Sequence, residues 1–125
     1  MKQILFIVML LTLQITAIAQ KKTPVEKAKA KTEEMQKDLQ LTADQHKKVY
    51  DINVKAYQAI ADYEAKDPGK KLKKKQKNIV QDLREAEYKR ILTAAQYKKY
   101  LDLKKKEKAQ KEKEAKELEK LKSKK

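Results

Sequence analysis

Apolar residues recur at steps of three and four along most of this chain, which is the spacing of one face of an α-helix. A narrow stripe of this kind covers residues 24–39, and similar patterns cover residues 43–66 and 71–91. A fourth begins at residue 92 and fades beyond residue 103. We therefore predict an all-α domain of four helices over residues 20–103.

Local signals mark the start of the first helix and the end of the second. Thr23 precedes Pro24, and Glu26 follows at the position from which its side chain can reach back to the cap, so this segment predicts a helix start. The Asp-Pro-Gly sequence at residues 67–69 ends the second helix. Proline cannot continue a helix, and glycine relieves the turn that follows.

The other two starts share one motif, Leu-Thr-x-x-Gln. The segments LTADQHKKVYDIN and LTAAQYKKYLDLK match at seven of thirteen positions and begin 51 residues apart. Each threonine is predicted to cap its helix, each glutamine to bond back to the cap N–H, and each leucine to pack near the first turn. We interpret the motif as structural and not catalytic, with direct contact to a bound protein as the alternative. Its members are Leu41, Thr42, Gln45, Leu92, Thr93 and Gln96.

The second helix carries more apolar surface than one core requires. One stripe contains Val49, Ile52, Ala56, Ile60 and Tyr63. A second stripe, rotated by roughly 100°, contains Tyr50, Val54, Tyr57 and Ala61. A helix packed on a single core needs an apolar arc of only about 100° or somewhat more. We therefore predict that the second stripe is an intermolecular surface; the alternative is a thin core that wraps this helix on both sides.

Charge adds a second candidate surface. The 125 residues include 33 Lys and Arg against 18 Asp and Glu, which gives a formal net charge of +15. The densest basic cluster lies at the start of the third helix and contains Lys70, Lys71, Lys73, Lys74, Lys75 and Lys77. Basic charge beside tyrosines suits an acidic, partly unfolded polypeptide, because charge steers its capture and apolar contacts hold it.

The last segment, residues 104–125, holds eleven Lys and five Glu and lacks a continuous apolar stripe. Such a segment cannot bury enough apolar surface to fold alone. We expect a solvated, helical or frayed extension of the fourth helix.

Residues 1–19 have the order of features found in a secretory signal peptide. Lys2 precedes an apolar run, and the segment closes with small residues at Ala17 and Ala19. We expect cleavage before Gln20 and export of the remainder. The alternative is a membrane anchor, but the unbroken apolar run is about half of the ~20 residues that a spanning helix needs.

Composition excludes several classes of function. The chain has no cysteine, one glycine and one histidine, His46. Thiolate metal sites, His-based triads and glycine-rich phosphate loops are therefore not expected. We predict a protein that is not an enzyme and uses no cofactor or metal, with a metal or pH-sensing role for His46 as a minor alternative. Export also argues against nucleic acid as the partner.

Paired Leu-Thr-x-x-Gln motifs in a small, charge-rich, helical chain behind a signal peptide resemble the Spy/CpxP family of periplasmic proteins. The resemblance covers about residues 25–105. It implies a cradle-shaped, antiparallel homodimer that acts as an ATP-independent chaperone for unfolded or partly folded envelope proteins. The lysine-rich C-terminal extension departs from that family.

We therefore expect a periplasmic, chaperone-like protein that binds non-native polypeptides through a basic, tyrosine-containing helical surface. Three other functions stay open at this point. One is an envelope-stress regulator that docks on a membrane sensor protein. Another is an electrostatic binder of envelope polyanions, with anionic lipid head groups as one target. The third is a metal-resistance protein, which the single histidine and the absence of cysteine disfavour.

Overall fold

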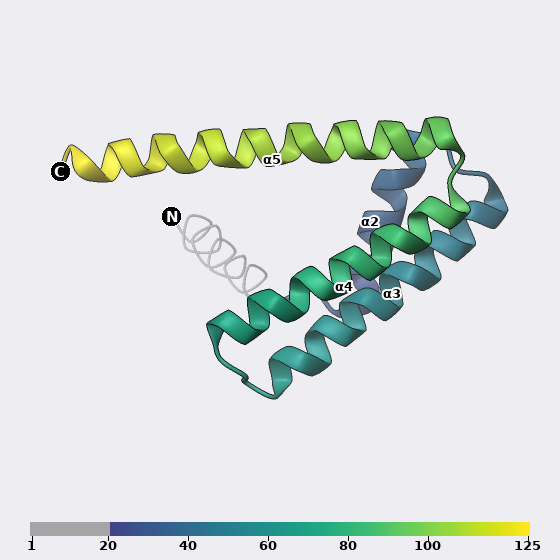
Figure 1. Ribbon diagram of the computed structural model, residues 1–125, viewed down its shortest axis with the longest axis horizontal. Coiled ribbons are helices and arrows are strands. Elements are labelled where there is room, and N and C mark those ends of the chain that lie inside the picture. The colour runs from purple at the N-terminus through teal and green to yellow at the C-terminus, as the bar shows by residue number, and fades with distance from the viewer. Residues whose placement is uncertain (1–20) are drawn as a thin grey trace, which may run out of the picture.

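The computed structural model describes residues 21–125, and over these residues the protein is all-α (Figure 1). Its helices are α2 (Pro24–Leu39), α3 (Ala43–Ala65), α4 (Lys70–Ile91) and α5 (Ala94–Ser123). The predicted fold class and the four predicted helices are confirmed. The predicted signal peptide, residues 1–19, lies outside the described residues.

The boundaries of α2, α3 and α4 lie within one residue of the predicted ones, and α5 begins directly after Thr93, the predicted cap. Capping boxes form at Thr23, Thr42 and Thr93, with the side chain three residues later bonded back to each cap N–H. Helix α4 begins after Gly69, whose φ of 85° lies in the left-handed half of backbone space, and no side chain among residues 21–125 caps it. Its start therefore depends on the Asp-Pro-Gly turn instead of a cap.

Helices α3 and α4 form an antiparallel hairpin, and α2 packs across α3 (Figure 1). Helix α5 diverges from this body and touches α2 and α4 only near its start. The helix continues without a break to Ser123, and every residue from Lys104 onward is exposed. The segment predicted as a helical or frayed extension is thus one continuous helix with the fourth.

The core lies where the four helices meet. Its buried apolar cluster consists of Met35, Leu39, Leu41, Val49, Tyr88, Leu92 and Tyr100. The rings of Tyr88 and Tyr100 meet edge to face with centroids 5.3 Å apart. Both motif leucines belong to this cluster, so the motif contributes to the core as well as to the caps.

A buried polar chain crosses the same region and was not predicted. The Tyr88 hydroxyl donates to Asn53 Oδ1, and Asn53 Nδ2 donates to Thr32 Oγ1 at 2.9 Å. Thr32 Oγ1 in turn donates to the Ala28 carbonyl at 2.7 Å. Asn53 and Tyr88 are 0% exposed and Thr32 is 1% exposed. The chain joins α2, α3 and α4, because each buried polar group finds its partner on the next helix.

Asn53 also explains how α3 packs. The buried residues of this helix are Val49, Asn53 and Ala56; Val49 and Ala56 belong to the first predicted stripe, and Asn53 lies beside them on the side of the second. The remaining members of both stripes are half-buried. The single chain therefore already places α2 against one side of α3 and α4 against the other, as the thin-core alternative anticipated.

The two core tyrosines predict a loss of stability at high pH. Burial raises the pKa of both Tyr88 and Tyr100 from 10.0 to about 12. Below pH 10 both states are protonated and the protein keeps its full stability. Between about pH 10 and pH 12 the unfolded tyrosines ionise first, so the free energy of unfolding falls by up to about 1.4 kcal/mol per pH unit for each tyrosine.

Urea unfolding between pH 9 and pH 12 measures this slope. Tyr100→Phe is the informative variant, because it keeps the ring in the core and its hydroxyl makes only a long 3.4 Å contact with Glu85. The tyrosine contribution to the slope should be about halved in this variant. A variant slope equal to that of the wild type would show that Tyr100 does not control the decline.

Candidate functional site

The two Leu-Thr-x-x-Gln motifs lie against each other at one end of the domain. Thr42 Oγ1 accepts from the Gln45 N–H at 3.2 Å, and Gln45 Oε1 accepts from the Thr42 N–H at 3.0 Å. Thr93 and Gln96 repeat this arrangement at 3.2 and 2.9 Å. Each motif thus starts its own helix, α3 or α5.

The two glutamines also bond to each other across the 51 residues that separate them. Gln45 Nε2 donates to Gln96 Oε1 at 2.8 Å, and Gln96 Nε2 donates to Gln45 Oε1 at 3.1 Å. The second N–H of each amide reaches a helix end: Gln45 to the Ile91 carbonyl at 3.1 Å, and Gln96 to the Leu39 carbonyl at 3.3 Å. Both donors and both lone pairs of each amide are therefore used.

This arrangement, which we call the glutamine clasp (Gln45 and Gln96), joins four helix ends. Ile91 is the last residue of α4 and Leu39 is the last residue of α2, so the clasp ties two helix ends to two helix starts. The sequence predicted the two caps, which are local. The cross-link between them was missed, although the repetition of a glutamine at the same position of both motifs was its signal.

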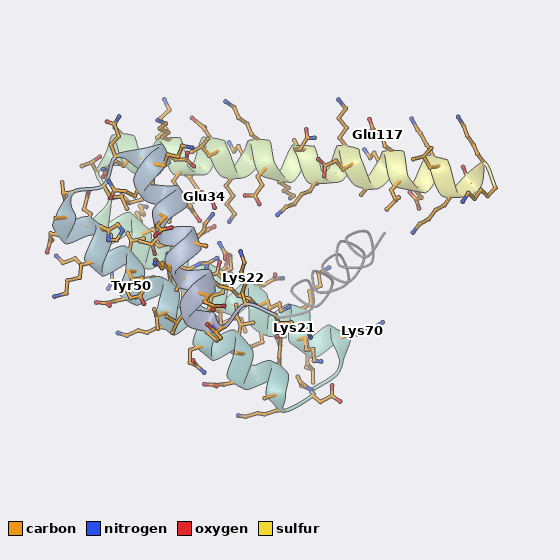
Figure 2. All side chains as sticks on the ribbon, turned by 180° about the vertical axis from the view of Figure 1, so that it is seen from behind. Lys21, Lys22, Glu34, Tyr50, Lys70 and Glu117 are labelled. Carbon is orange, nitrogen blue, oxygen red and sulfur yellow. The ribbon has the colours of Figure 1, made fainter. Side chains whose placement is uncertain are left out.

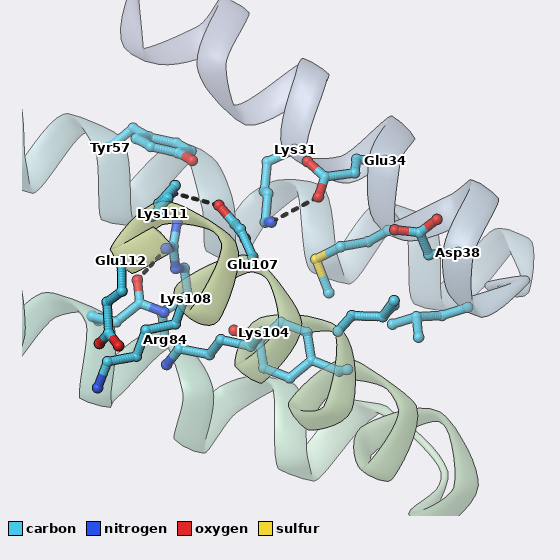
Figure 3. A pocket seen from close by; sticks show the side chains of 15 residues that line it. Lys31, Glu34, Asp38, Tyr57, Arg84, Lys104, Glu107, Lys108, Lys111 and Glu112 are labelled. Carbon is cyan, nitrogen blue, oxygen red and sulfur yellow. Dashed lines mark hydrogen bonds and ion pairs between the residues drawn. The ribbon is translucent and has the colours of Figure 1, made fainter. Parts of the chain in front are cut away.

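An open groove lies beside the clasp, between α2, α4 and α5, with a volume of about 890 Å³ (Figure 3). Its floor is apolar and aromatic, formed by Met35, Leu39, Tyr57, Tyr100 and Leu103. Its rim is charged, with Lys31, Glu34 and Asp38 on α2 and Lys104, Glu107, Lys108, Lys111 and Glu112 on α5. We call this feature the central groove.

Opposite charges pair along each side of the rim. Lys31 contacts Glu34 at 3.2 Å on α2, and Lys111 contacts Glu107 at 2.6 Å on α5. The hydrogen bond from Lys111 lowers the pKa of the Glu107 carboxyl and raises the pKa of Lys111 itself. The Glu107 carboxylate therefore stays ionised and paired at neutral pH.

Arg84 lies at the inner side of the groove and is incompletely paired. Its guanidinium carbon sits 5.2 Å from the centroid of the Tyr57 ring, and Nη2 donates to Gln81 Oε1. Its Nε and Nη1 atoms are buried and have no hydrogen-bond partner. No other buried side-chain nitrogen or oxygen in residues 21–125 lacks a partner.

A second cation lies close to Arg84. Lys104, in α5, pairs with Glu85. Burial lowers the pKa of Lys104, and the positive charge of Arg84 lowers it further. Two cations therefore meet at the inner end of the central groove, and Glu85 pairs with only one of them, Lys104.

The structure places the predicted tyrosines and the predicted lysine cluster in different parts of the molecule. Tyr57 lies in the central groove, whereas Tyr50 and Val54 are half-buried and do not line it. The lysine cluster lies at the hairpin turn, where Lys77 pairs with Glu64 at 2.7 Å and Lys73 with Asp67 at 3.2 Å. Figure 2 shows Lys70 and Tyr50 at opposite ends of the hairpin. Glu64 lies 14 residues beyond Tyr50, about 20 Å along α3.

Cations from α4 and α5 accompany Tyr57 instead. The segment predicted as a solvated extension, residues 104–125, contains three of these cations, Lys104, Lys108 and Lys111. The low apolar content of this segment hid its role, because a charged wall gives no periodic apolar signal. This segment faces α2 across the groove because of the direction in which α5 leaves the clasp.

A second apolar surface, the outer face, lies on the α3–α4 hairpin. Leu72, Ile79 and Leu83 are 50%, 43% and 64% exposed, although they share one line on α4. Leu83 borders a shallow depression with Ile52, Ala59 and Val80, at whose edge lie Lys55 and Glu87. The surplus apolar surface of this chain is therefore mainly on α4, one helix later than the sequence suggested.

The described residues offer little for metal or membrane chemistry. His46 is half-exposed in the first turn of α3, and residues 21–125 contain no group of three His, Asp or Glu side chains that could hold a metal ion. Within the same residues, no helix combines the length and the apolar character required to cross a bilayer.

Comparisons with known proteins give one match. The family described as Domain of unknown function (DUF4890) matches residues 16–100, which span the clasp and the first three described helices. No curated protein and no solved structure matches the chain.

The clasp predicts that its two glutamines act as one unit. Gln45→Ala and Gln96→Ala should each lower the free energy of unfolding by about 2 kcal/mol, because each leaves a helix-end carbonyl and a cap N–H without a partner and removes half of the bonds of the other amide. The double variant should cost less than the sum of the two, by about 0.5 kcal/mol or more. Urea unfolding of all four proteins gives the coupling directly.

Thr42→Ala and Thr93→Ala provide the matched control. These side chains bond only within their own caps, so each should cost about 1 kcal/mol and their effects should add. Strictly additive glutamine effects would contradict the clasp as a coupled unit.

Proposed function

This chain belongs to the family described as Domain of unknown function (DUF4890), and we propose that it binds non-native polypeptides without ATP, as an exported, periplasmic chaperone-like protein. The central groove is the observation that carries this proposal. The open apolar floor can accept apolar side chains from many different polypeptide sequences. A rim with both positive and negative residues is compatible with bound chains of different charge.

The floor and the rim have different roles in this proposal. Leu103 is half-buried and supplies non-directional apolar contact, while Met35, Leu39 and Tyr100 lie buried beneath the floor. Tyr57, also half-buried, adds aromatic contact area with a polar tip. The excess of lysine on the molecule speeds the capture of acidic chains, and this contribution weakens with salt.

Export supports independence from ATP. We propose that residues 1–19 are removed as a signal peptide, which places the remainder outside the cytoplasm. The single glycine of the chain, Gly69, lies in the turn before α4, so no glycine-rich phosphate loop supports a nucleotide-driven cycle. Release of a bound chain would then follow from its own folding.

One alternative is an envelope-stress regulator, for which the bound polypeptide would be a membrane sensor protein. The same groove would serve, so a narrow preference for one partner would distinguish it. The lysine cluster at the hairpin turn favours a second alternative, the binding of envelope polyanions through charge alone. That interaction would vanish at high salt.

Two truncations test the groove against charge. Ending the chain after Glu112 removes six Lys and three Glu and leaves every groove residue in place. Ending it after Leu103 removes a further five Lys and two Glu, an equal net charge, and deletes one wall of the groove. Only the shorter protein should lose suppression of aggregation, measured by light scattering of a reduced, unfolding client without nucleotide at 0.3 M salt.

Both truncated proteins should keep the melting temperature of the full chain, since residues 104–125 are exposed. A loss of suppression that follows the net charge removed would favour the polyanion alternative. Full suppression by the shorter protein would exclude the central groove as the binding surface.

We also propose that a second copy of the chain covers the outer face, as an antiparallel homodimer. Residues 21–125 bury only ten apolar residues in the core, which is thin for a domain of this length. The outer face carries both Lys55 and Glu87 beside its apolar residues. A two-fold pair can therefore set each lysine against the glutamate of the other copy.

Leu83→Ser tests this arrangement. Its side chain is exposed in the monomer, so helicity should be unchanged while sedimentation velocity shows a shift from dimer to monomer. Leu118→Ser is the matched control, because Leu118 is 54% exposed on the projecting part of α5 and should have no effect. A monomeric wild type, or an equal effect of both variants, would contradict the homodimer.

A further inference from the structure

Arg84 is the one described residue whose bonding is left incomplete in a buried setting. Arginine stays charged at any pH at which the protein is folded, and its guanidinium has five N–H donors. One nitrogen, Nη2, donates to Gln81, while Nε and Nη1 are buried without an acceptor. A buried cation with free donors is costly, and its usual explanation is an anion that completes the site.

Three acids near Arg84 are engaged with lysines. Glu85 bonds to Lys104, Glu107 bonds to Lys111, and Glu34 bonds to Lys31. Asp38 and Glu112 also line the groove, but no carboxylate of residues 21–125 bonds to Nε or Nη1 of Arg84. Lys104 adds a second positive charge to the same end of the groove.

We propose that Arg84 binds a carboxylate of the polypeptide that lies in the central groove, either an Asp or Glu side chain or the C-terminal carboxylate. This assignment rests on the proposed function and names its preferred ligand. A planar carboxylate accepts charge-assisted hydrogen bonds from a guanidinium, and the Tyr57 ring stabilises the cation from its other face. The neighbouring apolar side chains of the ligand would rest on Tyr57 and Leu103, the half-buried residues of the groove floor.

The shape of the ligand site favours a carboxylate more than the charge of the rim does. Glu34, Asp38, Glu107 and Glu112 line the groove together with Lys31, Lys104, Lys108 and Lys111, so the rim charges balance. A planar carboxylate matches the planar guanidinium of Arg84, and the apolar floor beside it accepts the rest of a peptide segment. The site thus selects segments in which a single acid adjoins apolar residues.

Fluorescence anisotropy with three labelled peptides tests the assignment. All share one leucine- and serine-containing sequence of twelve residues: the first has one internal Glu and an amidated end, the second has Gln and an amidated end, and the third has Gln and a free C-terminal carboxylate. The wild type should bind the first or the third peptide about tenfold more tightly than the second, as one charge-assisted hydrogen bond provides. The stronger of the two identifies the source of the carboxylate.

Arg84→Gln should abolish this preference and leave the affinity for the neutral second peptide unchanged. Arg84→Met keeps the volume of the stem and should behave in the same way, with a melting temperature at least equal to that of the wild type because an unpaired buried cation is removed. Arg90→Gln is the matched control: it removes the same charge from α4 at an exposed position paired with Glu87, and it should retain the tenfold preference.

The outcomes separate the two levels of the proposal. Binding of the neutral peptide with no preference for either acid would overturn the assignment of Arg84 and leave the groove as a polypeptide site. A preference that survives Arg84→Gln and Arg84→Met, or that Arg90→Gln weakens equally, would show general electrostatics and overturn the assignment as well. If no peptide bound to the wild type, the proposed function would fail and the carboxylate site with it.

Discussion

Two uncharged side chains, Gln45 and Gln96, hold four helix ends together at one point. Each amide satisfies a helix start through its oxygen and a helix end through its nitrogen, and the two amides complete each other. Backbone groups at helix termini are otherwise left to water, so this junction replaces several solvent contacts with a fixed geometry. The path of α5 away from α2 follows from it, and the central groove is the space between them.

The local parts of this structure were predictable from the sequence, and the contacts between distant residues were not. Helix boundaries came within one residue because Thr-x-x-Gln and Asp-Pro-Gly act over three or four residues. Asn53 and Tyr88 were missed because a buried polar residue looks solvent-facing until its partner on another helix is known. Tyr57 lines the central groove, whereas the sequence joined it in one candidate surface to Tyr50 and a lysine cluster that lie elsewhere.

The same limit explains why the α5 wall of the groove was not expected. Amphipathic patterns reveal which side of a helix meets an apolar core, but Lys104 to Glu112 meet α2 through charge and across open space. Their pattern of lysine and glutamate is identical in kind to that of the exposed end of the helix. The part of α5 that lines the groove therefore differs from the projecting end of the same helix only in its position relative to α2, which follows from the direction in which α5 leaves the clasp (Figure 1).

The division of polar chemistry between core and groove has a physical consequence. In the core, the glutamine clasp and the chain through Asn53 are neutral and fully paired, so the body of the protein holds its shape across neutral pH and salt. At the inner end of the groove, two buried donors of Arg84 have no acceptor, and lysines of α5 line the same groove. The core, whose polar groups are neutral and paired, therefore supports a cation with unpaired donors at the groove. A bound acidic chain would stabilise Arg84 without rearranging the core.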